Sequence, residues 1–405
     1  MSAINIALLG LGTVGKGVLE TIDTHQERLQ FVLGKPVKVA AILVKNIDKH
    51  VLTDKTILLT DQFEDIIQLE NLDVVIDAIV GTEPGFTYVK QSIEKGCHII
   101  TANKEMFAHH GEELLDLAKK HHVSIGFEAT VGGGIPVIQT LRKLLNVNSI
   151  TKVEGIINGT SNFILTNMRE KGLPFEEVLK SAQEKGYAEA DPTNDVEGYD
   201  AYYKALVLSN VVFGQLPKKE HIVRKGITHI TKEQISIVSS LGLKYKHIVK
   251  LERQGNDIHC FVEPVLVTST HPFYSVEGVQ NAVSIDADIV GNITLSGPGA
   301  GKLPTASAVI EDLLHLYQEQ PLTFFGLESK ANKQEVEKGQ WLLLNVQIDE
   351  DVLKQTFEEV ESINNQTIYL KGFRENIKKL ENQYPNVAYY SIEGEFLQLN
   401  ELLYA

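Results

Sequence analysis

The chain has 405 residues, of which 43% are hydrophobic, and a formal net charge of −15 at pH 7. This length and composition predict two or three domains with buried cores. The excess of acidic residues disfavours nucleic acid and anionic membrane surfaces as partners.

Signals for targeting and for disulfides are sparse. The first residues run directly into a strand, and no apolar run approaches the ~20 residues that a membrane-spanning helix needs. The two cysteines, Cys97 and Cys260, cannot form a disulfide framework, and each lies in an apolar run. We therefore expect a cytoplasmic protein whose cysteines belong to the core.

The N-terminus carries the arrangement of a dinucleotide-binding site. Ile4–Leu9 is a short apolar strand, and a glycine-rich turn joins it to a helical pattern. In such a turn the first glycine permits the tight bend, the second lets a pyrophosphate approach the backbone, and the third lets helix and strand pack. The alternative is a purely structural turn. The residues of the predicted site are Gly10, Leu11, Gly12, Thr13, Val14 and Gly15.

The end of the second predicted strand bears on cofactor choice. Val37–Val44 is followed by Lys45, where NAD-specific sites usually carry an acid that binds the ribose 2′-OH. A cation there can meet a 2′-phosphate, so NADP(H) is favoured while NAD(H) is possible. The alternative is a solvated loop lysine, and the residues do not decide between the two.

Two further apolar runs, Asp73–Val80 and His98–Thr101, are typical of parallel strands, and a helical pattern separates them. Ligands of open α/β sheets bind outside the carboxyl ends of the strands. Lys104 stands at such an end, directly after the second run. It is therefore a better candidate for the site than an average surface lysine.

Three consecutive glycines, Gly132–Gly134, follow a predicted strand at Val123–Phe127 and precede a helical pattern. Such a turn forms a hollow that is lined by the backbone. The helix N-terminus would attract an anion, whereas exposed carbonyls would bind a hard cation. A tight structural turn is the third possibility, and the residues alone leave all three open.

After Ile150 strands and helices are mixed, which is typical of an α+β domain. The stretch Gly186–Lys204 holds five carboxylates and leads into an apolar helix. Asp200 and Lys204 are four residues apart on that helix and therefore share a face. An ordinary surface salt bridge has the same spacing. A lysine among acids on a buried helix is nevertheless a candidate proton donor, because burial and neighbours set its pKa.

A later glycine-rich turn, Ser296–Gly301, precedes a helical pattern over residues 306–317. We expect this helix to pack back against the nucleotide-binding domain and to close the active-site cleft. A plain interdomain turn is the alternative.

The last part of the chain is predicted to form a separate small domain. Residues 318–336 are polar and indicate a linker, after which Trp341–Ile348 predicts a strand and Asp351–Ile363 a helix. Together with the strand–helix–strand signals that follow, residues 337–405 predict a ferredoxin-like unit. It carries no glycine-rich catalytic turn, so we interpret it as regulatory or structural. Its deletion is expected to leave an active enzyme.

Six motifs, in order between about Ile4 and Leu316, resemble those of the homoserine dehydrogenases, in the single-function form without a fused kinase. They are ALLGLGTVGKGV, TANKEM, FEATVGGGIP, GIINGTSNFIL, GYAEADPTNDVEGYDAYYK and GPGAGKLPTASAV. Six ordered motifs are far more specific than any one of them. The resemblance implies the reversible reduction of L-aspartate 4-semialdehyde to L-homoserine with NAD(P)H, in threonine, methionine and isoleucine biosynthesis, by a homodimer.

The expected fold is α/β, with a Rossmann-type doubly wound parallel sheet, an α+β domain for substrate binding and dimerisation, and a small ferredoxin-like, ACT-like C-terminal domain. The expected boundaries are 1–130 for the nucleotide-binding domain, completed by 302–317, then 131–301, the linker 318–336, and 337–405.

The resemblance also implies catalytic and substrate-binding roles. Lys204 resembles the proton donor, Asp200 the residue that orients the substrate, and Glu189 the residue that holds the substrate amino group. Lys104 is expected to serve as a second cation near the same substrate oxygen. The chain departs from the family pattern between Asp200 and Lys204, where two adjacent tyrosines replace smaller or charged residues, but the helical spacing is intact.

The remaining implied residues concern the cofactor and a cation. Thr101 and Lys104 resemble residues beside the nicotinamide, and Gly186 and Gly301 match positions that line the cofactor. The FEATVGGGIP loop resembles the family's Na⁺ site, which backbone carbonyls form. The corresponding residues are Glu128, Val131, Gly133 and Ile135.

Two other functions fit parts of the sequence. A phosphorylating semialdehyde dehydrogenase needs an exposed cysteine nucleophile, and neither cysteine is suitably placed. A nucleotide-bound regulatory protein that senses an amino acid through its tail has no need of Glu189 or of the Asp200–Lys204 pair. An absorbance assay at the NADPH band with homoserine distinguishes the three.

Overall fold

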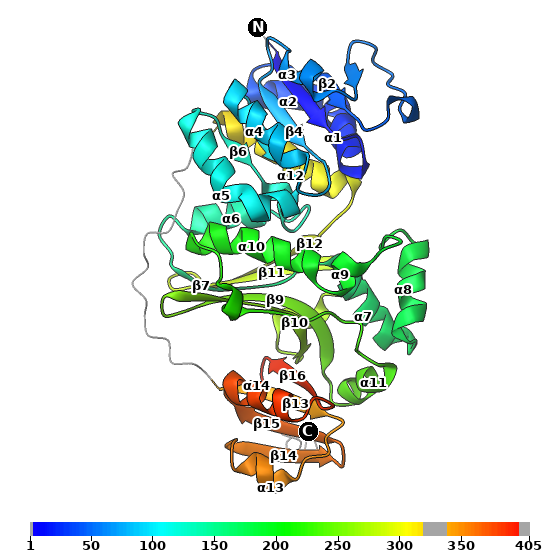
Figure 1. Cartoon of the computed structure of the whole chain (residues 1–405), viewed down its shortest axis with the longest axis vertical. Helices are drawn as coiled ribbons and strands as arrows, with labels where there is room; N and C mark the ends of the chain where they lie inside the picture. The colour runs from blue at the N-terminus through cyan, green and yellow to red at the C-terminus, as the bar shows by residue number, and fades with distance from the viewer. Residues whose placement is uncertain (1–2, 319–337, 397–405) are drawn as a thin grey trace.

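The computed structural model describes residues 3–318 and 338–396 of the chain. Their strands form two sheets, a parallel one near the N-terminus and a larger mixed one that includes the C-terminal strands. Figure 1 shows the first sheet with its helices at one end of an elongated molecule, the second sheet in the middle, and the C-terminal elements at the other end.

The first sheet has six strands in the order β3-β2-β1-β4-β5-β6, and every neighbouring pair is parallel. The strand order reverses between β1 and β4, which makes their carboxyl ends a topological switch point. This confirms the doubly wound, Rossmann-type sheet. The strands are β1 (Ile4–Leu9), β2 (Val37–Leu43), β3 (Leu58–Thr60), β4 (Val74–Asp77), β5 (His98–Thr101) and β6 (Ile125–Gly126).

Helices cover both faces of this sheet, as buried parallel strands require. They are α1 (Thr13–Thr24), α2 (Gln26–Leu33), α3 (Phe63–Ile67), α4 (Gly85–Lys95), α5 (Lys104–Lys120), α6 (Val137–Leu144) and α12 (Lys302–Gln318).

The helix α12 comes from late in the chain and returns to the first sheet. It packs against α1 so closely that a Cβ on Gly17 would lie 2.4 Å from the carbonyl oxygen of Lys302. Its Asp312 accepts a hydrogen bond of 2.8 Å from the backbone N–H of Glu128, just after β6. The expected return of this segment to the N-terminal part of the chain is therefore observed, and Figure 1 shows it in yellow beside the blue and cyan elements.

The second sheet follows the order β12-β11-β7-β9-β10-β16-β13-β15-β14, and β8 also pairs with β10. β9 and β10 pair antiparallel over their whole lengths. The strands that precede the tail are β7 (Ile150–Ile156), β8 (Ile222–Arg224), β9 (Lys244–Gln254), β10 (Asp257–Val267), β11 (Gln280–Ala287) and β12 (Gly291–Pro298).

Among the helices beside this sheet, α10 (Tyr199–Phe213) is apolar on nearly all sides. A helix with that pattern must be buried, and α10 lies between the helices of the first sheet and the strands of the second (Figure 1). The other helices of this part are α7 (Gly159–Lys171), α8 (Phe175–Glu184), α9 (Thr193–Val196) and α11 (Lys232–Ser240).

The C-terminal elements alternate as expected for a ferredoxin-like unit, but one boundary was wrong. The predicted helix Asp351–Ile363 ends after α13 (Glu350–Lys354), and β14 (Glu359–Asn364) follows. β14 lies at the edge of its sheet and, among the described strands, pairs only with β15, so this segment is held as a strand by pairing rather than by its own polarity pattern, and it is only partly buried. The remaining elements are β13 (Gly339–Leu344), β15 (Thr367–Gly372), α14 (Arg374–Gln383) and β16 (Ala388–Glu393).

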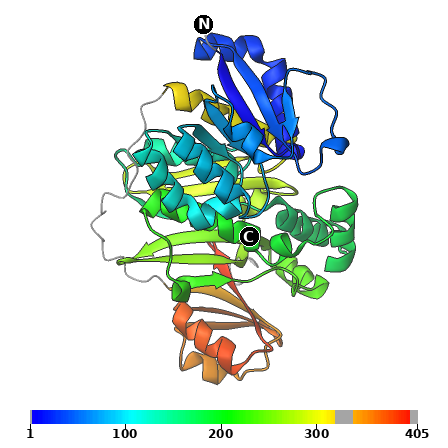
Figure 2. The same cartoon turned by 45° about the horizontal axis from the view of Figure 1, so that its top comes forward.

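The C-terminal strands continue the second sheet. β16 pairs in parallel with β10, with Leu266 opposite Ile392 and Val267 opposite Glu393, and Figure 2 shows the red strand reaching the green sheet. Leu342 and Tyr390 of the tail belong to the same buried cluster as residues of α7, α8 and α11. Most of the expected linker 318–336 lies outside the described residues.

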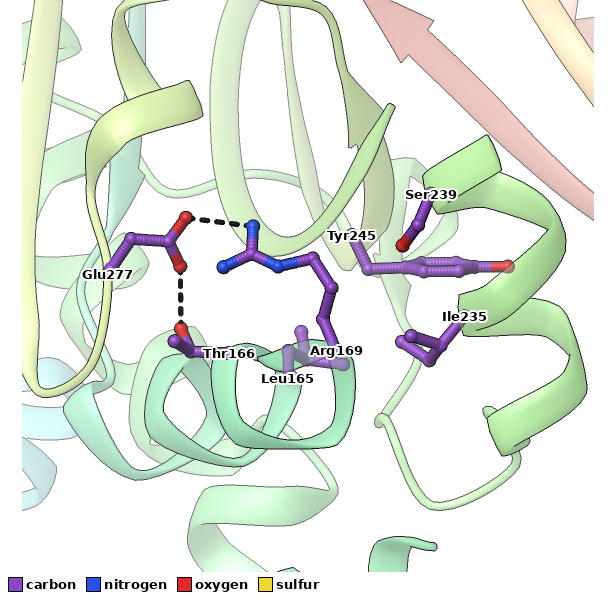
Figure 3. Close-up of a pocket in the computed structure, with 7 residues that line it drawn as sticks. All are labelled: Leu165, Thr166, Arg169, Ile235, Ser239, Tyr245 and Glu277. Atoms are coloured by element: carbon purple, nitrogen blue, oxygen red, sulfur yellow. Dashed lines mark hydrogen bonds and ion pairs between the residues drawn. The ribbon is translucent and has the colours of Figure 1, made fainter. Parts of the chain in front are cut away.

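A small pocket lies between α7, α11 and β9 (Figure 3). At its edge the carboxylate of Glu277 accepts from Arg169 at 3.0 Å, from Thr166 at 2.9 Å and from Lys244 at 2.7 Å. The buried ammonium of Lys246 lies 3.3 Å away on the other carboxylate oxygen. One acid thus gathers three cations and ties the loop before β11 to α7 and β9.

Candidate active site

The glycine-rich turn after β1 is built to receive a phosphate group. Gly10 has φ of +101°, and a Cβ there would lie 2.9 Å from the carbonyl oxygen of Ala78. Gly12 is the N-cap of α1, with no side-chain cap and no acidic residue in the first turn. No heavy atom lies within 4 Å of where its Cβ would be. The free N–H groups and positive dipole end of α1 therefore fit the pyrophosphate of a dinucleotide.

The β5–α5 turn carries Thr101 and Lys104 at the carboxyl edge of the sheet. The buried hydroxyl of Thr101 donates to Asp77 at the end of β4, at 2.9 Å, and accepts from the backbone N–H of Asn103. Asn103 is the N-cap of α5, because its side chain accepts from the backbone N–H of Met106 at 3.1 Å. Lys104 is the first residue of α5, the helix that follows β5, and it therefore lies at the carboxyl edge of the sheet.

Asp200, on the first turn of α10, joins two lysines. Its Oδ1 lies 2.7 Å from Nζ of Lys104, and its Oδ2 lies 2.7 Å from Nζ of Lys204. Lys204 therefore pairs with Asp200 within α10, as the spacing of four residues predicts. Lys104 reaches the same carboxylate from α5, a helix of the first sheet. Both oxygens of one buried acid are occupied by cations from two parts of the chain.

Two lysines at one acid are not equivalent. The side chain of Lys204 is 11% exposed, whereas that of Lys104 is 42% exposed. Lys204 Nζ also donates to the carbonyl oxygen of Ile157, at 2.6 Å. An ammonium group has three N–H donors, so Asp200 and Ile157 leave one of them for another oxygen.

The surroundings shift the three pKa values in different directions. Burial lowers the pKa of Lys204, although Asp200 acts against that effect. The charge of Asp200 raises the pKa of Lys104 and outweighs desolvation. Burial alone would raise the pKa of Asp200, but the two lysines hold it well below its usual value. Lys204 is thus the stronger acid of the two cations, and Asp200 remains a carboxylate.

Two further polar residues lie at this centre that were not predicted as site residues from their sequence. The side-chain amide of Asn158 donates to Asp200 at 2.9 Å and to Asp195 at 2.7 Å. Burial raises the pKa of Asp195, and the neighbouring Asp200 raises it further. Asn158 is the N-cap of α7 and belongs to the motif GIINGTSNFIL, from which no site residue was predicted. The acid-rich stretch contained Asp195, but only the helical spacing distinguished Asp200 from the other acids.

Other predicted site residues lie around this centre. Glu189 is exposed and close enough to raise the pKa of Lys104 by its charge, and within the described residues its carboxylate makes no hydrogen bond or ion pair. Gly186 follows α8 with φ of +73°, and Gly301 precedes α12 with φ of +123°. Lys45 is exposed just after β2, and in the described part of the chain no ion pair involves it.

The loop with the three glycines packs against the later glycine-rich turn. Gly132 and Gly133 have φ of +74° and +57°, and a Cβ on Gly133 would lie 2.4 Å from the backbone of Gly299. The backbone N–H of Gly134 donates to Pro298 at 3.0 Å. No group of three His, Cys, Asp or Glu side chains suited to a metal occurs in residues 3–318 and 338–396. A cation at this loop would therefore rely on backbone carbonyls, such as those of the residues predicted for Na⁺.

Both cysteines are buried and free. Burial raises the pKa of Cys97 to about 11 and that of Cys260 to about 12, so neither is a thiolate at neutral pH. This argues against a reaction that needs a cysteine nucleophile. Separately, none of the helices in the described ranges is both long and apolar enough to cross a membrane.

Comparisons with known proteins agree with this geometry. Residues 10–128 match the family model "Homoserine dehydrogenase, NAD binding domain", and residues 136–314 match the model "Homoserine dehydrogenase". The homoserine dehydrogenase of Bacillus subtilis is 43% identical over 328 residues, which cover 80% of this chain and 76% of that protein.

Solved structures extend the likeness to nearly the whole chain. A homoserine dehydrogenase from Thiobacillus denitrificans is 33% identical with a TM-score of 0.87, and the match covers 97% of this chain and 99% of that one. A hyperthermophilic archaeal homoserine dehydrogenase in complex with NADPH is 27% identical with a TM-score of 0.68, covering 81% of this chain and 100% of that one.

Proposed function

The chain belongs to the homoserine dehydrogenase family, and we propose that Lys204 is its proton donor. The enzyme is an NAD(P)-dependent oxidoreductase of amino-acid biosynthesis that interconverts L-aspartate 4-semialdehyde and L-homoserine. The observation that supports the role of Lys204 is the unused third N–H of a buried ammonium that Asp200 and Ile157 hold in place.

The bound nicotinamide cofactor supplies the hydride chemistry. As the carbonyl carbon is reduced, negative charge grows on the carbonyl oxygen, and a nearby cation stabilises that charge. Lys204 can donate a proton to this oxygen through its third N–H, and its lowered pKa eases the transfer. In the reverse direction the neutral amine accepts the proton of the homoserine hydroxyl.

Lys104 and Asp200 have supporting roles in this proposal. The raised pKa of Lys104 keeps it charged, which suits a group that stabilises the developing oxyanion without giving up its proton. Asp200 fixes both ammonium groups at 2.7 Å and thereby orients them toward one substrate position. An uncharged residue in its place would leave two neighbouring cations to repel each other.

Glu189 is proposed to bind the substrate ammonium. Its carboxylate is exposed and makes no hydrogen bond or ion pair within the described residues, yet its charge lies near enough to raise the pKa of Lys104. A free carboxylate beside the catalytic lysines is suited to a charge-assisted hydrogen bond with an amino acid. This contact would fix which face of the substrate carbonyl meets the cofactor.

The cofactor is proposed to be NADP(H) in preference to NAD(H). Lys45 follows β2, the strand beside β1 on the adenosine side of the switch point. Its exposed ammonium is available to a ribose 2′-phosphate. Gly186 and Gly301 are proposed to line the cofactor, as their motifs imply.

Further properties are proposed from the family resemblance. The carbonyl groups of Glu128, Val131, Gly133 and Ile135 would hold Na⁺, and two copies of the chain would form a dimer. The tail would be an ACT-like domain, and the two free, buried cysteines suit a reducing cytoplasm.

The test of the proposed function is a spectrophotometric assay of the purified full chain with L-homoserine and NADP⁺. We expect absorbance at the NADPH band to rise only when homoserine is present, and to fall when L-aspartate 4-semialdehyde is added to NADPH. A phosphate-dependent reaction of the semialdehyde would support the phosphorylating dehydrogenase. Cofactor binding without turnover would support a regulatory protein.

A further inference from the structure

A buried carboxylate, Asp77, lies at the carboxyl end of β4 and is absent from the roles assigned above. It is 0% exposed. Leu9, the last residue of β1, pairs directly with it, and the next residue, Ala78, touches the glycine-rich turn at Gly10. Asp77 therefore lies at the switch point, immediately beside the expected phosphate site.

Asp77 holds the turn that carries Lys104. Its Oδ1 accepts from the backbone N–H of Ile79 at 3.0 Å, and its Oδ2 accepts from the hydroxyl of Thr101 at 2.9 Å. The same hydroxyl accepts from the backbone N–H of Asn103 at 3.0 Å, and Asn103 caps α5. A continuous chain of hydrogen bonds thus runs from the end of β4 to the first turn of α5, which begins with Lys104.

The charge of Asp77 has no cationic partner among residues 3–318 and 338–396. Burial raises its pKa to about 6, while hydrogen bonds from Ile79, Thr101 and Asn103 act in the opposite direction. At the neutral to slightly basic pH of a typical assay it is therefore mostly ionised. An unpaired buried carboxylate is costly, and such groups concentrate at functional sites.

The position of Asp77 relates this charge to one half of the cofactor. In a doubly wound sheet the dinucleotide lies across the switch point, with its adenosine toward β2 and its nicotinamide toward β4 and β5. The nicotinamide ring is cationic in the oxidised form and neutral in the reduced form. A fixed negative charge on this side consequently interacts more favourably with the oxidised form.

We propose that Asp77 is a positioning residue that anchors the β5–α5 turn and that its charge makes the site bind oxidised cofactor more tightly relative to reduced cofactor. Stabilising the product form of the cofactor favours the reduction of the semialdehyde. The proposal rests on the proposed function, because it requires a nicotinamide dinucleotide at this edge.

The test measures dissociation constants of NADP⁺ and NADPH separately, by protein or NADPH fluorescence, for the full chain and for Asp77→Asn. Asparagine keeps the size of the side chain and one hydrogen-bond acceptor but removes the charge. We expect the ratio of the constant for NADP⁺ to that for NADPH to rise roughly threefold to thirtyfold. Asp77→Glu keeps the charge and should leave the ratio within about twofold of the wild type.

Asp73→Asn is the matched control. Asp73 precedes the same strand at its amino end and accepts from the backbone N–H of Asn5 at 2.8 Å, so it places an identical charge change at the opposite edge of the sheet. In Asp73→Asn the ratio of the dissociation constants for NADP⁺ and NADPH should equal that of the wild type. Thr101→Val, which breaks the hydrogen bond between Thr101 and Asp77, should lower kcat.

Four outcomes would overturn the proposal. An equal loss of affinity for both cofactor forms in Asp77→Asn would indicate a structural role alone. A shift of the same size in Asp73→Asn would indicate an effect of net charge rather than of position. If the wild-type chain bound neither cofactor form, the proposed function would fall together with this inference, whereas normal binding with an unchanged ratio would overturn only the role of Asp77.

Discussion

At the scale of single residues, the proposed chemistry depends on Asp200, which binds a different lysine with each of its two carboxylate oxygens. Asp200 holds Lys104 and Lys204 at equal distances of 2.7 Å, yet burial lowers the pKa of Lys204 while the acid raises that of Lys104. In the proposed mechanism the same carboxylate therefore holds one proton donor and one permanent cation. Asn158 completes the arrangement by donating to Asp200.

Glu189 is tested by its replacement with leucine. We expect Glu189→Leu to raise the KM for homoserine far more than the KM for the cofactor, because the substrate ammonium loses a charge-assisted hydrogen bond of roughly 1.5–3 kcal/mol. Steady-state kinetics with each substrate varied in turn measures both constants. Glu184→Leu, an exposed acid at the end of α8, is the matched control. An unchanged KM for homoserine would remove Glu189 from the site.

Lys45 is expected to set a modest preference for NADPH. The phosphate and an exposed lysine are screened by solvent, so their attraction is weak, and a tenfold preference needs only ~1.4 kcal/mol. Lys45→Ala should erase most of the preference for NADPH and leave turnover with NADH unchanged. The preference that remains should no longer depend on salt concentration. The measurement is kcat/KM for both cofactors at low and high salt. A wild type that prefers NADH, or a variant that loses both cofactors equally, would refute this role.

Much of the site followed from local residue patterns, and the exceptions have physical causes. The pairing of Asp200 with Lys204 is set by helical spacing, which a sequence reveals directly. The approach of Lys104 to the same acid depends on how α5 packs against α10, and no local pattern reports that contact. Asn158 was missed because helix caps use the same small polar residues whether or not they also serve a site.

At the scale of elements, the helices that carry the site are held from several sides. α7 follows its N-cap Asn158, beside Asp200, and the side-chain amide of Asn162 on its first turn lies within hydrogen-bonding distance of carbonyl oxygens of the loop before β11 and of the first residue of β11. Farther along the helix, Thr166 and Arg169 bind Glu277 of the same loop. The pocket of Figure 3 is therefore lined by α7, the helix whose N-cap residue donates a hydrogen bond to Asp200.

The Glu277 cluster predicts a stability effect. Glu277→Gln leaves three neighbouring cations without their shared acid, so we expect the free energy of unfolding at neutral pH to fall by about 1–3 kcal/mol. Urea unfolding followed by circular dichroism measures this change. Glu170→Gln is the matched control, because Glu170 binds the same arginine at 3.1 Å but is exposed. An equal loss in both variants would contradict the special role of Glu277.

The pH dependence of that effect has a definite sign. Burial would raise the pKa of Glu277, but Lys244, Lys246 and the other donors lower it to about 2 from an ordinary value of 4.5. The folded state thus binds fewer protons than the unfolded state in this range, so the stabilisation is complete above about pH 4.5 and is lost as the pH falls toward 2. The difference between wild type and Glu277→Gln should shrink over that window. A constant difference would contradict it.

Elements differed in how well the sequence predicted them. β5 was predicted to the residue because its apolar run ends sharply in Thr101. β9 was not identified, because its charged residues interrupt its apolar residues irregularly, so neither a strict alternation nor a continuous apolar run is present, and its pairing with β10 is what defines it. The helix predicted over Asp351–Ile363 was too long. The helical signal of its first residues was continued over residues that form β14.

At the scale of the whole molecule, the tail is less separate than its sequence indicates. The strand β16 extends the second sheet from β10, and Arg374 of α14 lies 2.7 Å from Glu263 of β10. Lys225 forms an ion pair with Glu381, and the adjoining segment supports α9, since Ile227 donates to Val196 at 2.8 Å. The polar stretch and the new hydrophobic pattern after it predicted a separate domain. Neither feature reveals that a strand of the tail pairs with a strand far away in the sequence.

This continuity changes what truncation should do. Ending the chain before residue 338 would expose the edge of β10 and the buried cluster that Leu266 shares with Leu342 and Tyr390. Each large apolar side chain so exposed costs about 1.5–3 kcal/mol, so we expect a lower melting temperature and poor solubility, contrary to the expectation from sequence. Differential scanning fluorimetry measures this. Glu381→Gln, which breaks only the surface pair, is the control, and a truncated enzyme with unchanged stability would show that the tail is dispensable.

The most direct test of the catalytic account is the turnover of Lys204→Ala with homoserine and NADP⁺. Removal of a general acid typically lowers kcat by ~10²–10⁴-fold, and the dissociation constant of the cofactor and the melting curve should stay close to those of the wild type. Lys152→Ala is the matched control, because Lys152 is also ion-paired, at 3.1 Å to Glu154, but lies on β7 away from Asp200. A Lys204→Ala enzyme that keeps more than about a tenth of wild-type turnover would contradict the assignment of Lys204 as proton donor.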